Sequence, residues 1–181
     1  VVVNNNMPRE ALEQLIAYFE ANGIRYVLQS HNGVYASAEV QAIFADLISQ
    51  LGHGTTTDEN RVVSKFTDIS KADFSQVAKV TFISDEAGMV EHAQGELGEE
   101  FHVVPGSMPL PGGSNGEIAM RGTNKGAAIL AVLDHLGIDP SLSIGVGDSW
   151  NDVEMFEVCG VGIAMGNAEP ALKELANEVT T

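Results

Sequence analysis

Two carboxylates and a carboxamide stand in one short segment, Gly147-Asp148-Ser149-Trp150-Asn151-Asp152, directly after an apolar run. In open α/β sheets ligands bind at the carboxyl ends of the strands, so Asp148 would lie at the mouth of a crevice, where its carboxylate could bind Mg²⁺. Asp152, one helical turn further on, could reach a metal-bound water. Asn151 could bind a phosphoryl oxygen without competing for the metal. The alternative is that Asp148 only caps the following helix, because Gly-Asp-Ser is a good capping sequence.

A lysine at the predicted start of another helix is the second candidate. Lys125 follows a predicted strand at 117–121 and opens a predicted helix at 125–136. A cation at a helix N-terminus opposes the helix dipole, at a cost of about a few tenths of a kcal/mol. An anion between the ammonium group and the helix N-terminus would reverse that balance, and phosphate is the obvious anion. The alternative is a solvated surface lysine that binds nothing.

The charge composition argues against two classes of partner. The chain of 181 residues has 25 acidic and 9 basic side chains and a formal net charge of -16. Such a surface repels nucleic acid and anionic membranes, so neither is expected as a partner. An anionic substrate would need focused Lys or Arg side chains or a bound divalent cation. No apolar run reaches the roughly 18 residues that span a bilayer, and we expect a cytoplasmic protein of the globular type. The composition sets no expectation for the oligomeric state.

Residues 1–115 show a mixed rhythm of strands and helices. We expect strands at 1–3, 24–28, 34–36, 77–83 and 101–104, and helices from residue 8 to 21, 37 to 50 and 86 to 97. The polar run 52–60 is predicted as a loop. Residues 105–116 hold three prolines and four glycines, so we interpret them as the approach to a domain junction near 112–116.

Residues 116–181 alternate strictly between strand and helix. Strands are predicted at 117–121, 142–146 and 161–165, each followed by a helix, at 125–136, 150–158 and 170–177. This order predicts an α/β fold with a parallel sheet, in which Ile144 and Ile163 lie on neighbouring strands. We therefore expect two domains, 1–115 and 116–181.

From Gly116 to Thr181 the sequence resembles the C-terminal third of the Cof-type phosphatases of the haloacid dehalogenase (HAD) superfamily. Lys125-Gly126 matches the third motif of that family, and Gly147–Asp152 matches its fourth, GDxxND. The segment Gly162–Ala168 also fits the family pattern. Residues 1–115 resemble the α/β cap of the C2B type by position and rhythm. The resemblance implies a HAD-like Rossmannoid parallel sheet for residues 116–181.

The resemblance also implies a function, the Mg²⁺-dependent hydrolysis of small phosphate esters such as sugar phosphates through an aspartyl-phosphate intermediate. It makes Lys125, Asp148 and Asp152 catalytic. Asp148 would bind the metal, Asp152 would support the metal shell, and Lys125 would offset charge on the phosphoryl oxygens. Asn151 would contact phosphate, and Asn167 would shape the same pocket.

One departure from the family pattern bears on activity. The family carries its nucleophile in an Asp-x-Asp strand near the N-terminus, whereas no Asp of this sequence is followed by another Asp two positions later. We therefore expect a fragment that lacks the nucleophile and is inactive alone. The alternative is a non-catalytic HAD-like binding or structural module. A receiver-like signalling domain would also have an acidic pocket and a lysine, but it does not explain GDxxND.

Overall fold

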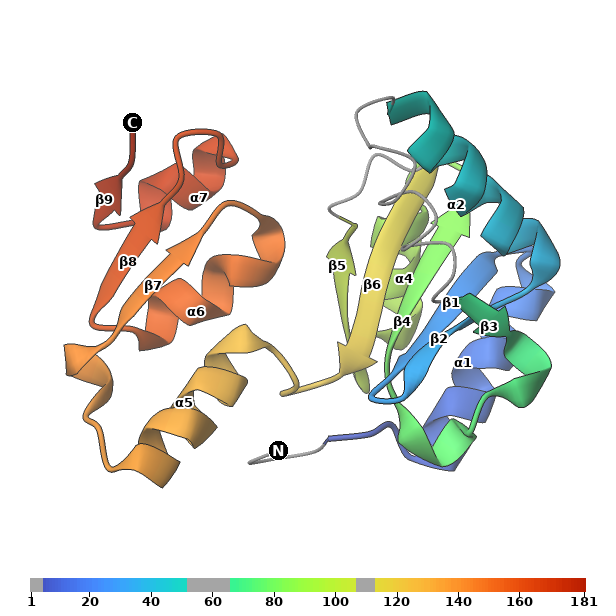
Figure 1. Cartoon of the computed structure of the whole chain (residues 1–181), viewed down its shortest axis with the longest axis horizontal. Coiled ribbons are helices and arrows are strands. Elements are labelled where there is room, and N and C mark those ends of the chain that lie inside the picture. Colours follow the sequence, from blue (N-terminus) through green and yellow to red (C-terminus); the bar gives the residue numbers. More distant parts are fainter. Residues whose placement is uncertain (1–4, 52–65, 107–112) are drawn as a thin grey trace. The chain divides into compact units, whose positions relative to one another are not determined.

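The structure, a computed structural model, describes residues 5–51, 66–106 and 113–181. The chain forms two compact units, one from Asn6 to Met120 and one that contains Arg121–Thr181 (Figure 1). The strand predicted at 1–3 and the loop predicted at 52–60 lie outside the described residues. Within the described part, no helix combines the length and the apolar character that a membrane span requires.

The first unit is built on a six-stranded sheet with the order β3-β2-β1-β4-β6-β5 (Figure 1). A hairpin of β1 (Arg25–Ser30) and β2 (Gly33–Ala36) pairs through β1 with β4 (Val77–Ser84). All pairs are antiparallel except that of β2 with the edge strand β3 (Phe66–Asp68). At the opposite edge, β6 (Ser114–Met120) separates β4 from β5 (Phe101–Pro105). Two short 3₁₀ turns, Ile69–Lys71 and Phe74–Gln76, link β3 to β4.

Helices cover both faces of this sheet, but unequally. Helices α1 (Arg9–Ala21) and α4 (Met89–Leu97) pack on one face, where alternate strand residues such as Leu28, Val80 and Phe82 are buried. Helix α2 (Ala38–Leu51) covers only a smaller apolar patch on the other face, formed by Val27, Ala36 and Ile83. Because side chains alternate between the faces of a strand, the two sets belong to opposite sides of the sheet.

The second unit contains a three-stranded parallel sheet with the order β7-β8-β9 (Figure 1). Its strands are β7 (Ile144–Gly147), β8 (Val161–Ala164) and β9 (Glu178–Val179), and its helices are α5 (Lys125–Leu136), α6 (Val153–Val158) and α7 (Pro170–Leu175). Two 3₁₀ turns, η3 (Pro140–Leu142) and η4 (Trp150–Asp152), flank β7. Ile144 pairs with Val161 and Val146 with Ile163, so the neighbouring parallel strands predicted for Ile144 and Ile163 are confirmed.

The strand expected at 117–121 belongs to the other sheet. As β6 it begins at Ser114 and pairs antiparallel with β4 and β5, so the alternation of the second unit starts at α5. The compact units consequently divide between Met120 and Arg121 rather than after residue 115. The glycine at position 116 of β6 is needed because the strand passes close to the Phe82 ring. A Cβ on Gly116 would lie 2.4 Å from that ring. Gly116 lets β6 pack against that ring.

The second unit leaves much apolar surface open. Within the described chain, β7 pairs with β8 alone, and its outward side chains Ile144 and Val146 are 65% and 54% exposed. Helix α5 adds the exposed side chains of Leu130, Val132 and Leu136. A parallel sheet is normally covered on both faces, so this surface is unusual for a strand of that kind.

Candidate phosphate and metal site

The sequence-predicted site residues come from three places in the second unit. Asp148 follows the last residue of β7, and Asn167 lies in the loop after β8, the parallel neighbour of β7. Lys125 is the first residue of α5, whose N-cap Asn124 accepts a hydrogen bond from the Ala127 backbone N–H at 2.8 Å. The carboxyl ends of parallel strands meet at one edge of a sheet, and this topology brings Asp148 and Asn167 together.

Asp152 is the buried centre of the cluster, with 3% of its surface exposed. Its Oδ1 accepts a hydrogen bond from Lys125 Nζ in an ion pair. Its Oδ2 accepts from the backbone N–H groups of Asp148 and Ser149, at 3.0 and 3.1 Å. Burial alone raises the pKa of Asp152, but the bonds from Lys125 and the two backbone groups outweigh it and hold the pKa below its ordinary value of 3.8. Asp152 is therefore ionised, and its hydrogen bonds connect α5 to the turn after β7. We call this set of contacts the Asp152 bracket.

Gly147 provides the space for this bracket. A Cβ at Gly147 would come within 2.5 Å of the Asp152 carboxyl carbon. Gly126 has the corresponding role at α5, where a Cβ would lie 2.4 Å from the backbone oxygen of Glu154 in α6. The two glycines allow α5, α6 and the end of β7 to approach closely enough for Lys125 to reach Asp152.

Lys125 holds a second partner in the same turn. Its Nζ donates to Asn151 Oδ1 at 3.2 Å, and its side chain is 48% exposed. The ammonium group is thus fixed by a carboxylate and a carboxamide on one side, while about half of the side chain stays open to solvent. The solvated, unpartnered lysine considered from the sequence is not what the structure shows.

Asp148 carries the exposed carboxylate of the cluster. Its Oδ2 accepts a hydrogen bond from Asn167 Nδ2 at 3.3 Å, and both side chains are exposed. Backbone bonds from Met165 N to Gly147 O (2.8 Å) and from Glu169 N to Asp148 O (3.3 Å) hold the two loops side by side. The N-cap of η4 is Ser149, and Asp152 accepts from its N–H as in a capping box. The cap interpretation of Asp148 therefore fails.

The donor set fits Mg²⁺ at one carboxylate. Among the residues that the structure describes, no three His, Cys, Asp or Glu side chains gather into a metal site. Mg²⁺ is commonly bound by only one or two protein carboxylates, with waters and substrate oxygens completing its octahedron. Asp148 offers such a carboxylate, and the oxygens of Asp152 are already taken by N–H donors. Of the two carboxylates, that of Asp148 is exposed and that of Asp152 is buried.

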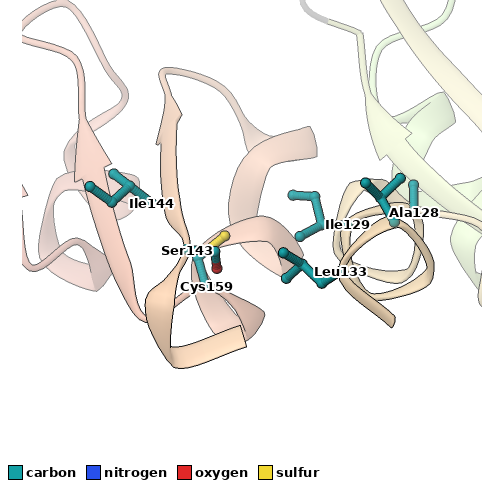
Figure 2. A pocket seen from close by; sticks show the side chains of 7 residues that line it. Ala128, Ile129, Leu133, Ser143, Ile144 and Cys159 are labelled. Carbon is teal, nitrogen blue, oxygen red and sulfur yellow. The ribbon is translucent and has the colours of Figure 1, made fainter. Parts of the chain in front are cut away.

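The cavity drawn in Figure 2 is a different feature from this polar cluster. It measures about 350 Å³ and lies between α5 and the start of β7, against Cys159. Apolar side chains dominate its lining: Ala128, Ile129, Val132, Leu133, Ser143, Ile144 and Cys159. No charged group lines it, so it does not suit a phosphate.

One contribution to the site is not visible from residue types. The backbone N–H groups of Asp148 and Ser149 fix the turn by donating to Asp152, and a backbone donor leaves no mark in the side-chain pattern. In the sequence, Gly147 indicates that another group lies close to this turn, but it does not identify that group as Asp152.

Comparisons with known proteins agree on one family. The family model described as haloacid dehalogenase-like hydrolase matches residues 1–181. The HMP-PP phosphatase of Cronobacter sakazakii is 33% identical over 111 residues, which cover 60% of this chain and 39% of that protein. The 5-amino-6-(5-phospho-D-ribitylamino)uracil phosphatase YcsE of Bacillus subtilis is 40% identical over 67 residues, 37% of this chain and 27% of that protein. The chain thus spans well under half of these curated relatives.

Solved structures share the fold over almost the whole chain. A haloacid dehalogenase-like hydrolase from B. subtilis aligns with a TM-score of 0.74 and 21% identity, covering 97% of this chain and 67% of that one. A HAD subclass IIB sugar phosphatase aligns with a TM-score of 0.72 and 20% identity, covering 99% of this chain and 64% of that one. The α/β fold expected from the sequence is confirmed.

Proposed function

Because this chain belongs to the family of haloacid dehalogenase-like hydrolases, we propose that it provides the metal-binding and phosphate-binding part of a Mg²⁺-dependent phosphatase for small phosphorylated metabolites. The observation that carries the proposal is the bracket formed by Asp152, which fixes Lys125 on one side and the Asp148 turn on the other. It sets an exposed carboxylate and a half-exposed ammonium group on one rigid support. The curated relatives described above are phosphatases by name.

Each residue then has a separate task. Asp148 would hold Mg²⁺, with Asn167 orienting its carboxylate. Lys125 Nζ would bind a phosphoryl oxygen with its exposed side, and Asn151 would help to hold both the lysine and the phosphate. Asp152 is the positioning residue for Lys125 and for the turn. The bound cation would neutralise the charge of the phosphoryl oxygens.

The attacking carboxylate is proposed to come from residues outside these 181. No Asp-x-Asp occurs in the sequence, and Asp152, the buried carboxylate of the cluster, is engaged by three donors. The step would join a carboxylate oxygen to phosphorus and release the alcohol, and water would then cleave the acyl phosphate. The unit Asn6–Met120 would be the cap that selects the substrate, a sugar phosphate or similar ester, and the other unit part of the catalytic core.

The binding part of the proposal can be tested without turnover. Trp150, the single tryptophan of the chain, stands two positions after Asp148 and is 41% exposed, so its fluorescence reports on this turn. Titration of the 181-residue chain with MgCl₂, with and without inorganic phosphate, should give a saturable change. Asp148→Asn should remove it, whereas Asp134→Asn on the exposed surface of α5 should not. An unchanged titration in Asp148→Asn would rule out the metal assignment.

A non-catalytic module is the second candidate, favoured by the absence of Asp-x-Asp from the sequence. The phosphatase and the non-catalytic module can be distinguished by adding an Asp-x-Asp strand segment from a HAD phosphatase, in trans or as a fusion. Phosphate release from sugar phosphates with Mg²⁺ should then appear, and it should disappear again in Asp148→Ala. If the chain binds Mg²⁺ and phosphate but never gains turnover, the module is favoured. Robust hydrolysis by the 181-residue chain alone would contradict the assigned roles.

A further inference from the structure

Three asparagines of the chain are followed by glycine, and each lies in a different structural setting. They are Asn22, Asn32 and Asn115. In such a pair the backbone nitrogen of the glycine can reach the side-chain carbonyl carbon of the asparagine, because glycine has no Cβ to obstruct the approach. Attack at that carbon leads to loss of the amide group. The reaction needs a free carboxamide and a main chain that can rotate, so the structure decides which asparagine reacts.

Asn115 is held within the six-stranded sheet. It lies in β6, between β4 and β5, and the following Gly116 is buried and paired with both Phe82 and Pro105. The carboxamide is also tightly packed, because a Cβ on Gly106 would lie 1.8 Å from Asn115 Oδ1. The backbone nitrogen of Gly116 could reach the carboxamide only after the central strands separate.

Asn22 is held at the end of α1. Its Nδ2 donates a hydrogen bond to the Tyr18 backbone oxygen at 2.8 Å, and the Gly23 backbone N–H donates to Glu20 O at 3.4 Å. Both reacting groups are thus engaged by the last turn of the helix. The reaction has to wait until that turn opens.

Asn32 differs from both, because its carboxamide is free. It lies exposed in the two-residue turn that joins β1 to β2 (Figure 1). Its backbone N–H donates to Ser30 Oγ at 3.1 Å, and that hydroxyl donates to Gly33 O at 3.3 Å. Within the described part of the chain, the Asn32 side chain has no hydrogen-bond partner. The turn is therefore held through its backbone and the Ser30 hydroxyl alone.

The main chain at this turn can open at little cost. Ser30 and Gly33 form the last pair of the β1–β2 ladder, and the pairing of β1 with β4 is irregular at the same end, between Gln29 and Ser30. His31 and Asn32 have no positive φ, whereas the two-residue turns that fit the twist of a hairpin have one at the first central residue. Terminal pairs open far more often than a central strand.

We propose that Asn32 is a site of spontaneous deamidation in the folded chain. The Gly33 backbone nitrogen attacks Asn32 Cγ and forms a C–N bond, the Cγ–Nδ2 bond breaks, and ammonia leaves with the proton of the attacking nitrogen. Water then opens the five-membered imide at either carbonyl, which gives aspartate or isoaspartate at position 32. The net reaction consumes water, releases ammonia and needs no other reactant.

The modification changes both charge and backbone at the hairpin tip. Each event adds a negative charge to a chain whose formal charge is already -16, and the isoaspartate product lengthens the main chain by one carbon within the turn. The inference uses no residue of the second unit. It goes beyond the proposed phosphatase function and can fail without it.

The test compares the folded chain with the chain unfolded in guanidinium chloride, both kept in mildly alkaline buffer. Trypsin places Asn22, Asn32 and Asn115 in three separate peptides, 10–25, 26–61 and 80–121, and mass spectrometry follows the conversion of amide to acid in each. In the folded chain Asn32 should react at least about tenfold faster than the other two, a barrier lower by about 1.4 kcal/mol. In the unfolded chain the three rates should become similar, because glycine follows all three.

A variant tests the attacking atom. A Cβ on Gly33 would lie 3.5 Å from the Tyr35 ring, an ordinary contact, and the φ of Gly33 is not positive, so Gly33→Ala should fold. The added Cβ should slow the reaction at Asn32 about tenfold. Gly95→Ala in α4, where a Cβ would meet nothing within 4 Å, should leave that rate unchanged.

Several outcomes would overturn the proposal. One is a rate at Asn22 or Asn115 that equals or exceeds the rate at Asn32 in the folded chain. Another is the same ratio of rates in folded and unfolded chain, which would show that the fold has no influence. Aspartate without isoaspartate would exclude the imide route. These comparisons use the wild-type chain, so they decide the question even if Gly33→Ala does not fold.

Discussion

The carboxamide of Asn167 donates a hydrogen bond to Asp148 Oδ2 at 3.3 Å, between two loops that follow neighbouring parallel strands. The contact engages one carboxylate oxygen of an exposed side chain. Asn167 was expected from the sequence to shape a phosphate pocket. That role stays a prediction, and we propose in addition that Asn167 positions the proposed metal ligand.

The first prediction concerns this contact. Asn167→Ala should lower the Mg²⁺ affinity of the 181-residue chain about tenfold, as loss of a partner of a metal ligand commonly does. The measurement is the Trp150 fluorescence titration. Asn177→Ala is not a suitable control, because Asn177 Oδ1 accepts a hydrogen bond from the Gly162 backbone N–H. Glu174→Gln on α7 is a suitable control instead. An affinity equal to that of the wild type would separate Asn167 from the metal site.

Asp152→Asn should destabilise the second unit. The change removes the charge that pairs with Lys125 and turns one buried acceptor into a donor facing other donors. Because Lys125 is about half exposed, the expected loss is about 1 to 3 kcal/mol rather than the larger cost of a fully buried pair. Urea unfolding followed by Trp150 emission measures it. Asp134→Asn, also in this unit but exposed, should change the midpoint little; equal midpoints for the two variants would disprove the bracket.

The lowered pKa of Asp152 sets a pH dependence. A carboxyl whose pKa is lower in the folded than in the unfolded state stabilises the fold above the unfolded value of 3.8, and this contribution is lost as the pH falls below 3.8 through the folded pKa. The difference in unfolding free energy between wild type and Asp152→Asn should therefore be constant above about pH 5 and shrink in stronger acid. A difference that grows on acidification would reverse the assigned sign.

Gly147→Ala should act through the same bracket. Its Cβ would come within 2.5 Å of the Asp152 carboxyl carbon, so the carboxylate must move away from the turn or the strand must shift. We expect a loss of about 2 kcal/mol or more in stability, typical of overpacking a tight site, together with weaker Mg²⁺ binding. In the double variant Gly147→Ala, Asp152→Asn the two losses should not add, because both disrupt one set of contacts. Full additivity in urea unfolding would show two independent sites.

Sequence pattern was enough for those parts of the fold that depend on local order. The strands predicted at 142–146 and 161–165 correspond to the neighbouring strands β7 and β8, and the polar residues after the first of them indicated the edge where Asp148 lies. The sequence pattern did not show which of the two sheets a given strand joins. Alternation within β6 shows that one side is buried, but it does not say which sheet supplies the neighbours, and β6 was assigned to the wrong one.

The role of Asp152 shows the same limit at the level of single atoms. Its spacing from Asp148 predicts that the two lie on one side of a turn, and the structure places the Asp152 carboxylate against the Asp148 backbone N–H. Whether its oxygens face a cation or N–H groups depends on the approach of Lys125 from a helix 27 positions earlier, and residue type does not reveal that approach. The hydrogen bonds of Asp152 become visible only with coordinates.

The exposed apolar side chains of β7 and α5 have a thermal consequence. Ile144, Val146 and Leu136 are more than half exposed, and the tendency of such surfaces to leave water weakens on cooling. Self-association of the chain should accordingly be driven by entropy: light scattering should rise on warming from the cold to room temperature and reverse on rapid recooling. Sulfate should promote it at constant temperature, because excluded salts strengthen apolar burial. Purification in the cold at low salt would keep the chain dispersed.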